Sequence, residues 1–319
     1  MDAGGTKLLG GVVDAGLVVH HRVHRRIQGL DQAELVETIV DAVEEACAVA
    51  PDVEAVGFGI PALVRPETGS VMVSNHLPLD RLPFRALMSE RLDLPVAVDN
   101  DSNVAMLAEH RAGAARGADD AVMLTLGTGI GGGLLFGGEV YRGSAGAGAE
   151  LGHIVVDPDG LECPGDCPGR GCLEAFASGN AIGRAGAEAA RHSPDSGLGA
   201  ALAQGREITG GLVAELAHDG DEAAIEVLAE AGRWLGLGIV TLVNALNPEL
   251  VIVGGDLAQA GAVLLDPIAA SIDRHAVAPA AREVQVAQGM LGERAEVLGA
   301  AALVLSKTPR ALVERLASG

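Results

Sequence analysis

The sequence predicts a two-lobed α/β protein whose second half repeats the plan of its first. At 319 residues, of which 49% are hydrophobic, the chain is long enough to bury two cores. Stretches with strand and helix patterns alternate along it. Two glycine turns, at residues 2–7 and 126–133, occupy equivalent places near the starts of the two halves.

The first half contains strand and helix patterns in a clear order. Two strands are joined by the turn-type triplet Asp14-Ala15-Gly16. A helix, a strand with its loop, a short strand and a second helix follow, and a Gly- and Ala-rich stretch marks the lobe boundary. These segments are residues 8–23, 31–49, 53–64, 95–101, 102–113 and 114–120.

The second half opens with AVMLTLGTGIGGGLLFGGEVYRG, which repeats the plan of small-residue turn, strand, glycine turn and strand. Two such hairpins facing each other across a cleft could grip two ends of one polyphosphate. Residues 127–132 also satisfy G-x-G-x-x-G, but a dinucleotide fold needs a helix there, and the glycine-rich GLLFGGEVY is β-like. An ordinary tight hairpin is the alternative for either turn taken alone.

Charge narrows the classes of partner. Lys and Arg total 22 against 43 Asp and Glu, which gives a formal charge of −21. Such a surface repels nucleic acid and anionic membranes, so a bound polyanion requires a local site. The start lacks a signal peptide, and no run approaches the roughly 18 apolar residues of a membrane span. We therefore expect a cytoplasmic protein without nucleic-acid or membrane partners.

Three of the four cysteines lie within CPGDCPGRGC, at Cys163, Cys167 and Cys172. In a reducing compartment this cluster indicates a metal site, with free thiols or a redox pair as alternatives. Cys47 is most simply a small buried hydrophobic residue.

Six motifs in this order resemble the ROK family of sugar kinases and sugar-responsive repressors, within the hexokinase and actin-like superfamily. They are DAGGTK (2–7), VDNDSNVA (98–105), LGTGIGGG (126–133), GAELGH (148–153), CPGRGCLEAFASG (167–179) and NPELVIVGG (247–255). The resemblance implies an actin-like ATPase (ribonuclease H-like) fold with a cleft between two lobes that close on ATP and a sugar. We expect lobes at 1–112 and 118–294, and a helix at 295–319 that returns to the first lobe.

The resemblance implies an ATP site on glycine turns, where backbone N–H groups approach phosphate without an intervening Cβ. Lys7 adds positive charge or is a solvated surface lysine. Asp2 acts through Mg²⁺ or its water shell, or instead caps its turn. The expected ATP-binding residues are Asp2, Gly4, Gly5, Thr6, Lys7, Gly127, Thr128, Gly129, Gly254 and Gly255.

Asp101 is the expected catalytic base. Phosphoryl transfer requires a carboxylate that orients the acceptor hydroxyl and takes its proton. Asp99 is a local competitor, and the alternative for Asp101 is to cap the following helix, a role that Ser102 or Asn103 could fill instead. The family's Asn-Asp pair favours Asp101, with Asn100 on a sugar hydroxyl. Asn75 is a weaker candidate for the same pocket.

The resemblance also implies a structural zinc site. Three thiolates and an imidazole form a closed tetrahedral set, here His153, Cys163, Cys167 and Cys172. The common family spacing is C-x-C-G-x-x-G-C, whereas this chain has C-x3-C-x4-C, so Cys163 is the least certain ligand. Glu150 and Glu174 flank this loop as expected acceptors for sugar hydroxyls.

The second ring nitrogen of His153 is free to face the sugar. The alternative for Glu174 is an exposed carboxylate at a helix start, favoured by the helix dipole.

The predicted function is ATP-dependent phosphorylation of a hexose, with glucose and its 6-hydroxyl first, Mg²⁺ accompanying ATP, and a homodimer by analogy. The alternatives are an N-acetylhexosamine kinase, or a sugar sensor without kinase activity. Sensors of the family carry a DNA-binding segment ahead of the domain, for which the turn at residue 2 leaves no room. The donor, ATP or polyphosphate, stays open. Because the family's first turn follows a buried strand, we expect this chain to continue upstream; the alternative is that the first strand is absent and its sheet neighbours compensate.

Overall fold

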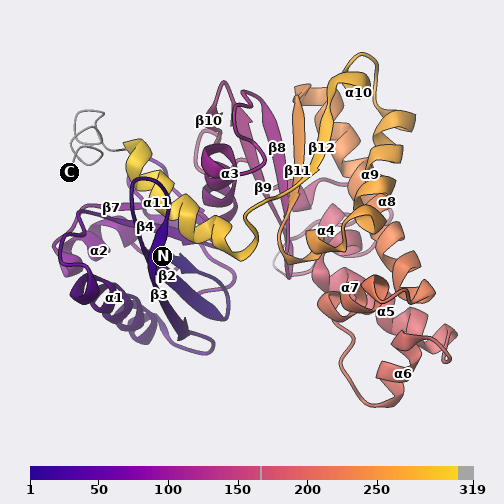
Figure 1. The fold of residues 1–319 in the computed structure, drawn as a ribbon, viewed down its shortest axis with the longest axis horizontal. Helices are drawn as coiled ribbons and strands as arrows, with labels where there is room; N and C mark the ends of the chain where they lie inside the picture. Colours follow the sequence, from indigo (N-terminus) through magenta and orange to yellow (C-terminus); the bar gives the residue numbers. More distant parts are fainter. Residues whose placement is uncertain (166, 308–319) are drawn as a thin grey trace. The chain divides into compact units, whose positions relative to one another are not determined.

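The computed structural model describes residues 1–165 and 167–307, which form two compact units (Figure 1). The first unit contains Met1–Arg116, Val140–Gly148 and the described part of Glu293–Gly319. The second contains Gly117–Glu139 and Ala149–Gly292. Residues 140–148 thus pack with the first unit, although the boundaries expected from the sequence place them in the second lobe.

The first unit is built on a five-stranded sheet in the order β3-β2-β1-β4-β7. The hairpin of β1, β2 and β3 is antiparallel, whereas β4 and β7 run parallel to β1. A two-stranded ribbon of β5 and β6 is separate. The strands are β1 (Asp2–Ala3), β2 (Lys7–Val13), β3 (Val19–Arg26), β4 (Val56–Ile60), β5 (Leu63–Val64), β6 (Val71–Val73) and β7 (Val96–Asn100).

Helices cover both faces of this sheet, as alternate residues of β4 show. Phe58 meets Phe84 of α2 edge to face, with ring centroids 5.2 Å apart. Gly57 and Gly59 point the other way, where a Cβ would meet α11 and α3. Helices α1 and α2 therefore share one face, and α3 and α11 share the other. The helices are α1 (Gln32–Val49), α2 (Phe84–Leu92), α3 (Asp101–Ala112) and α11 (Ala295–Lys307).

The second unit repeats this plan, with its sheet in the order β10-β9-β8-β11-β12. An antiparallel hairpin is again followed by two parallel strands. The strands are β8 (Ala121–Leu126), β9 (Ile130–Phe136), β10 (Glu139–Val140), β11 (Leu250–Gly254) and β12 (Gln285–Gln288). The repeated strand order confirms the predicted α/β fold with duplicated hairpins.

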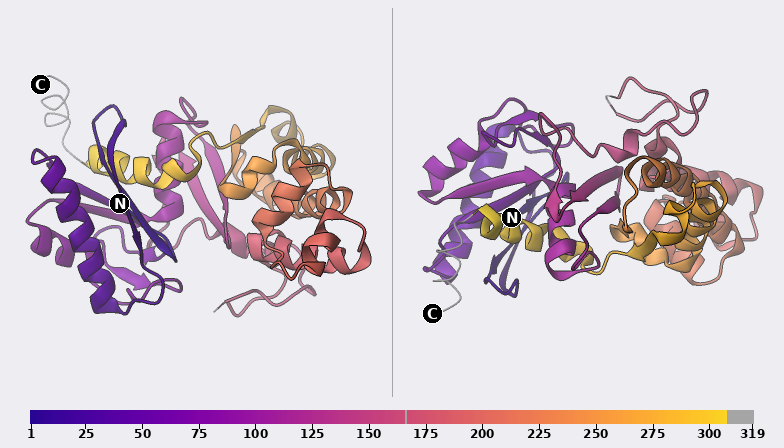
Figure 2. Two further views of the ribbon diagram at one scale, coloured as in Figure 1. Left: turned by 60° about the horizontal axis from the view of Figure 1, so that its bottom comes forward. Right: turned by 90° about the horizontal axis from the view of Figure 1, so that it is seen from above.

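Helices and short 3₁₀ turns complete the second unit, and α8 and α9 run side by side in each view (Figures 1 and 2). The α-helices are α4 (Leu173–Ala177), α5 (Gly179–His192), α6 (Gly197–Ala203), α7 (Gly210–His218), α8 (Glu222–Leu246), α9 (Ala262–His275) and α10 (Ala280–Glu283). The 3₁₀ turns are η1 (Leu151–His153), η2 (Asp256–Ala260) and η3 (Gly292–Arg294). Among the described residues, no helix is both long and apolar enough to cross a membrane.

Two details bear on the sequence predictions. Cys47 is only partly buried and packs against the core of the first unit. Strand β1 comprises only Asp2–Ala3, and the amino group of Met1 donates a 2.8 Å hydrogen bond to the carbonyl of Gly57 in β4.

Candidate functional site

The turn between β1 and β2 presents backbone donors. The Gly4 N–H donates to the Lys7 carbonyl (2.9 Å), and the Thr6 carbonyl accepts from the Ile27 N–H (3.1 Å). Gly5 and Thr6 are exposed, and within residues 1–165 and 167–307 their N–H groups have no hydrogen-bond partner. Two N–H groups without a partner on one tight turn are donors from which a bound anion could accept.

Two neighbouring carboxylates, those of Asp2 and Asp101, lie close to this turn. Asp2 is buried, and burial raises its pKa to about 7, with the neighbouring Asp101 adding to the rise while the Met1 amino group and Lys7 oppose it. Burial also raises the pKa of Asp101. A pair of acidic groups of this kind either shares a proton or attracts a cation.

At the turn from β7 into α3, the neighbouring residues Asn100 and Asp101 make different contacts. Asn100 is the N-cap of α3, because its Oδ1 accepts from the N–H groups of Ser102 (3.0 Å) and Asn103 (3.1 Å). Its Nδ2 donates to the Ala62 carbonyl at 3.4 Å. The Asp101 carboxylate accepts from the Ser102 N–H at 2.7 Å. The capping role therefore falls to Asn100, which the sequence argument had not considered, rather than to Asp101, Ser102 or Asn103.

Asp99, the competing base, is buried and fully engaged. Its Oδ2 forms an ion pair with Nε of Arg142 at 2.5 Å. Its Oδ1 accepts from Asn103 Nδ2 (3.1 Å) and from the Asn100 N–H (2.9 Å). Asp99 therefore has a structural role: its bonds hold in place the turn that carries Asn100 and Asp101.

The loop that follows β6 places one further group near Asp101. Asn75, predicted for this pocket, is exposed and has no hydrogen-bond partner among the described residues. Its neighbour His76 lies close enough to Asp101 to oppose the rise in the pKa of that carboxyl. A Cβ on Gly5 would lie 3.7 Å from His76 Cβ. The sequence argument missed His76, whose only signal was its adjacency to Asn75.

The turn between β8 and β9 repeats the arrangement of the first turn. The Gly127 N–H donates to the Gly129 carbonyl (3.1 Å), whereas the N–H groups of Thr128 and Gly129 have no partner in the described chain. The Gly179 N–H, at the start of α5, donates to the Gly127 carbonyl at 2.9 Å. The positive end of the α5 dipole thus lies beside the turn and favours anions there.

The loop after β11 lies against the same turn. Gly255 has φ +84°, and a Cβ there would lie 2.3 Å from the carbonyl oxygen of Leu126, the last residue of β8. Gly254 pairs with Thr125 in the parallel ladder. The predicted adenosine loop and the second phosphate turn therefore adjoin at the carboxyl ends of β8 and β11, where open α/β sheets bind ligands.

The four predicted metal ligands converge. The ligand atoms of His153, Cys163, Cys167 and Cys172 all lie within 4.8 Å of one another. Nδ1 of His153 is 3.4 Å from Sγ of Cys163, and the sulfurs of Cys167 and Cys172 are 4.0 Å apart. Tetrahedral zinc, with Zn–S about 2.3 Å and Zn–N about 2.0 Å, separates its ligand atoms by about 3.5 to 3.8 Å. The donor set and its spacing therefore fit zinc, and Cys163 belongs to the cluster.

Gly169 shapes the cradle around these sulfurs. Its N–H donates to Cys167 Sγ at 3.4 Å, and a Cβ at this position would lie 3.2 Å from Cys172 Sγ and 3.3 Å from Cys167 Sγ. A side chain at this position would therefore be tight against both sulfurs, and glycine lets the backbone approach them without displacing either. The added residues between Cys163 and Cys167 let the loop fold back, and the Cys163 N–H donates to the Gly169 carbonyl at 3.0 Å.

The two predicted sugar carboxylates differ in their contacts. Glu150 is exposed, and its carbonyl accepts from the His153 N–H at 3.1 Å, which ties it to the metal loop. Glu174 is half-buried, and its Oε2 accepts from the Ile130 N–H at 2.7 Å. The second phosphate turn and the metal loop are thus joined by one hydrogen bond.

Comparisons with known proteins agree with this geometry. Residues 1–307 match the ROK family. A glucokinase of Streptomyces coelicolor is 34% identical over 317 residues, which cover 97% of this chain and 98% of that protein. The crystal structure of a ROK family glucokinase from Streptomyces griseus, in complex with glucose and AMPPNP, has a TM-score of 0.84 and 36% identity, and the match covers 95% and 97% of the two chains.

A regulator is also similar. The crystal structure of a ROK family transcriptional regulator, a homologue of the Escherichia coli MLC protein, has a TM-score of 0.89 and 27% identity. The match covers 100% of this chain and 80% of the regulator. Kinases and regulators thus share this fold, and the chain belongs to the ROK family.

Proposed function

We propose that the protein transfers the γ-phosphoryl group of MgATP to the 6-hydroxyl of a hexose, with glucose as the first substrate to test. The chain is a sugar kinase whose glucokinase relatives match it from end to end. The observation that carries the proposal is Asp101, a carboxylate with a raised pKa at the carboxyl end of β7 that is released from capping by Asn100. A base poised nearer to neutrality is efficient in proton transfer.

Asp101 removes the proton of the sugar hydroxyl as its oxygen attacks the γ-phosphorus. The bond between that phosphorus and the bridging oxygen of ADP breaks, and the proton remains on the Asp101 carboxyl. The free N–H groups of the two glycine turns bind phosphate oxygens. Asp2 would hold the magnesium that accompanies ATP, directly or through its water shell, which would account for a buried acidic group beside a phosphate turn.

Sugar specificity depends on groups that bind hydroxyls. Asn100 can donate through Nδ2, because its Oδ1 is used in the helix cap. Glu150 and Glu174 accept hydrogen bonds, and the nitrogen of His153 that does not face Cys163 donates outward. Asn75 belongs to the same proposed set. These groups also suit an N-acetylhexosamine, which is the second substrate class to test.

We propose zinc for the cluster of three cysteines and His153, where it acts as a structural ion. All four ligand positions come from the chain, which leaves no open site for catalysis. A homodimer, a cytoplasmic location and the absence of nucleic-acid partners complete the proposal, the last because the formal charge is −21.

The decisive test is the release of ADP from MgATP across a panel of hexoses and N-acetylhexosamines, for the protein and for Asp101→Asn. Turnover that depends on the sugar and is lost in the variant supports the proposal and identifies the substrate. Sugar binding without turnover would instead support the sensor. Asp99→Asn is an unsuitable control because Asp99 carries the Arg142 ion pair.

A second phosphoryl donor, inorganic polyphosphate, is favoured by strand β3. On this edge strand His20, Arg22, His24 and Arg26 are exposed on one face. His20 pairs with Asp14 at 2.7 Å and Arg26 donates to Gln28 at 3.0 Å, so Arg22 is the residue of the row to test. Arg26 lies opposite Lys7 in the ladder, so this basic row begins at the first phosphate turn. In a chain of charge −21, a row of this kind suits a linear polyanion.

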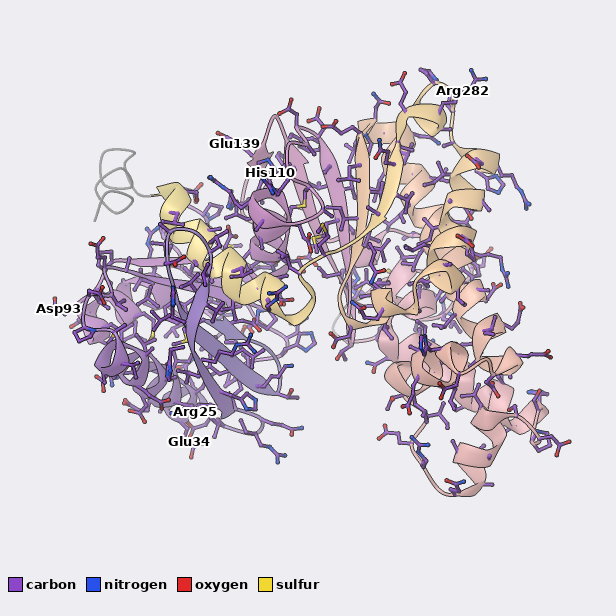
Figure 3. The ribbon with its side chains drawn as sticks, viewed as in Figure 1. Arg25, Glu34, Asp93, His110, Glu139 and Arg282 are labelled. Carbon is purple, nitrogen blue, oxygen red and sulfur yellow. The ribbon has the colours of Figure 1, made fainter. Side chains whose placement is uncertain are left out.

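Arg25, labelled in Figure 3, lies on the other face of β3 and forms an ion pair with Glu45 of α1. We expect Arg22→Gln to weaken use of polyphosphate while use of ATP is retained, with the exposed Arg206→Gln as the control. An equal loss of activity with ATP and with polyphosphate would argue against binding of polyphosphate by this basic row.

A further inference from the structure

Glu174 occupies the space beneath the second phosphate turn. A Cβ on Gly129 would lie 2.4 Å from Glu174 Oε2, so the carboxylate would have to move from its present place if residue 129 carried a side chain. The same oxygen accepts from the Ile130 N–H at 2.7 Å. The Glu174 carboxylate is thus in close contact with the backbone of the turn, unlike a carboxylate that projects into solvent.

This hydrogen bond fixes one particular peptide unit. The peptide between Gly129 and Ile130 offers the Gly129 carbonyl, which accepts from the Gly127 N–H at 3.1 Å, and the Ile130 N–H, which donates to Glu174. Both polar groups of the peptide are therefore used, and the peptide plane is set. The free N–H groups of Thr128 and Gly129 come immediately before it, so their direction depends on this plane.

The backbone of Glu174 is itself held by the metal loop. Cys172, two residues earlier, is one of the four clustered ligands and the N-cap of α4. The intervening Leu173 is fully buried, and its N–H donates to the Ile154 carbonyl at 2.8 Å. The path from the metal cluster to the turn is thus two residues of well-packed chain and one charge-assisted hydrogen bond.

We propose that Glu174 is a positioning residue for the second phosphate turn, and that the metal loop thereby sets the affinity for nucleotide even when no sugar is present. This inference rests on the proposed function, because it takes the turn to bind phosphate. It assigns the two carboxylate oxygens separate roles: Oε2 holds the Ile130 N–H, while Oε1 is available to a sugar hydroxyl. One side chain then couples the metal loop, the phosphate turn and the sugar.

The charge of Glu174 lets an experiment separate its hydrogen bond from its electrostatic effect on the ligand. A carboxylate beside a phosphate site repels the ligand, so a contribution to nucleotide binding must come through the hydrogen bond. Glu174→Gln keeps an acceptor oxygen for the Ile130 N–H and removes the negative charge. Glu174→Ala removes both. We therefore expect AMPPNP to bind Glu174→Gln as tightly as the parent or more tightly, and to bind Glu174→Ala about tenfold or more weakly.

The experiment measures binding of Mg-AMPPNP by calorimetry, without sugar, to the parent and both variants. The control is Glu162→Ala, an exposed carboxylate of the same loop that pairs with Arg170 at 2.8 Å. Removal of the metal with a chelator should weaken AMPPNP binding in the same direction as Glu174→Ala. Hydrogen exchange of the peptide that spans residues 126–136 should be faster in Glu174→Ala and unchanged in Glu174→Gln.

Equal affinity of the parent and Glu174→Ala would overturn the inference and leave Glu174 with a sugar role alone. A parent that is folded but binds no AMPPNP would instead refute the proposed donor. In that case the exchange of residues 126–136 still decides whether Glu174 holds the turn. If Glu174→Ala does not fold, weak binding by Glu174→Gln despite a native exchange pattern would refute the acceptor role.

Discussion

Replacement of Arg142 by alanine should destabilise the first unit strongly. Arg142 and Asp99 form an ion pair at 2.5 Å, with 25% and 6% of their side chains exposed. The substitution leaves the Asp99 carboxylate buried without its cation, and breaking a buried pair in this way costs about 3 to 5 kcal/mol. Asp99 keeps its bonds to Asn103 Nδ2 and the Asn100 N–H, and Arg142 is partly solvated, so we expect the lower end, about 3 kcal/mol.

Urea unfolding, followed by a probe in the first unit, is the assay. With a slope of about 1 to 3 kcal/mol per molar urea, a loss of 3 kcal/mol lowers the midpoint by about 1 to 3 M. The control is Arg233→Ala, which removes exposed pairs with Glu226 and Glu230 and should cost less than about 1 kcal/mol.

The double variant Asp99→Asn with Arg142→Gln should recover part of the loss, because it leaves no buried charge. A midpoint for Arg142→Ala equal to that of Arg233→Ala would refute the reasoning. Sugar-dependent activity offers a second readout, since the pair holds the turn that carries Asn100 and Asp101. We expect kcat to fall in Arg142→Ala even at temperatures where the protein remains folded.

Three further predictions concern pH, metal and backbone. Because the folded pKa of Asp2 is raised to about 7 from 3.8, its contribution to stability is present at low pH and is lost as the pH rises towards 7; thermal unfolding without Mg²⁺ should show this slope, and Asp2→Asn should reduce it. Cys163→Ser should lower bound zinc, measured by elemental analysis, whereas Cys47→Ser should not. Gly255→Ala (φ +84°, Cβ 2.3 Å from a carbonyl) should destabilise by more than the about 1 to 2 kcal/mol expected for Gly29→Ala, which has φ +82° and open space, as urea unfolding would show.

The sequence was most informative where function depends on the backbone. The glycine turns at 2–7 and 126–133 were recognisable because only residues without a Cβ let the chain approach an anion so closely. Their repetition also predicted the duplicated sheets, since each turn lies within the same antiparallel hairpin. The cysteine cluster was recognisable in the same way, because residue type and spacing define its chemistry.

Side chains whose role depends on distant partners were not predictable. Arg142 gave no signal, because its partner Asp99 lies 43 residues earlier and the strand order that brings them together is set by the whole fold. For the same reason, the sequence did not indicate that residues 140–148 pack with the first unit. The cap of α3 was also missed, because Asn100 could be read equally as a ligand of sugar or as a cap, and only the distances to Ser102 and Asn103 decide between them.

Glu174 shows how a motif can conceal a second role. Its place two residues after Cys172 was read as a tie to the metal loop, and this reading led only to the sugar. The bond to the Ile130 N–H spans 44 residues and depends on Gly129, which the sequence argument had assigned to phosphate. A glycine in a phosphate turn therefore meets two requirements at once. In the proposed site its backbone must approach phosphate, and the space that a Cβ would fill is taken by the Glu174 carboxylate.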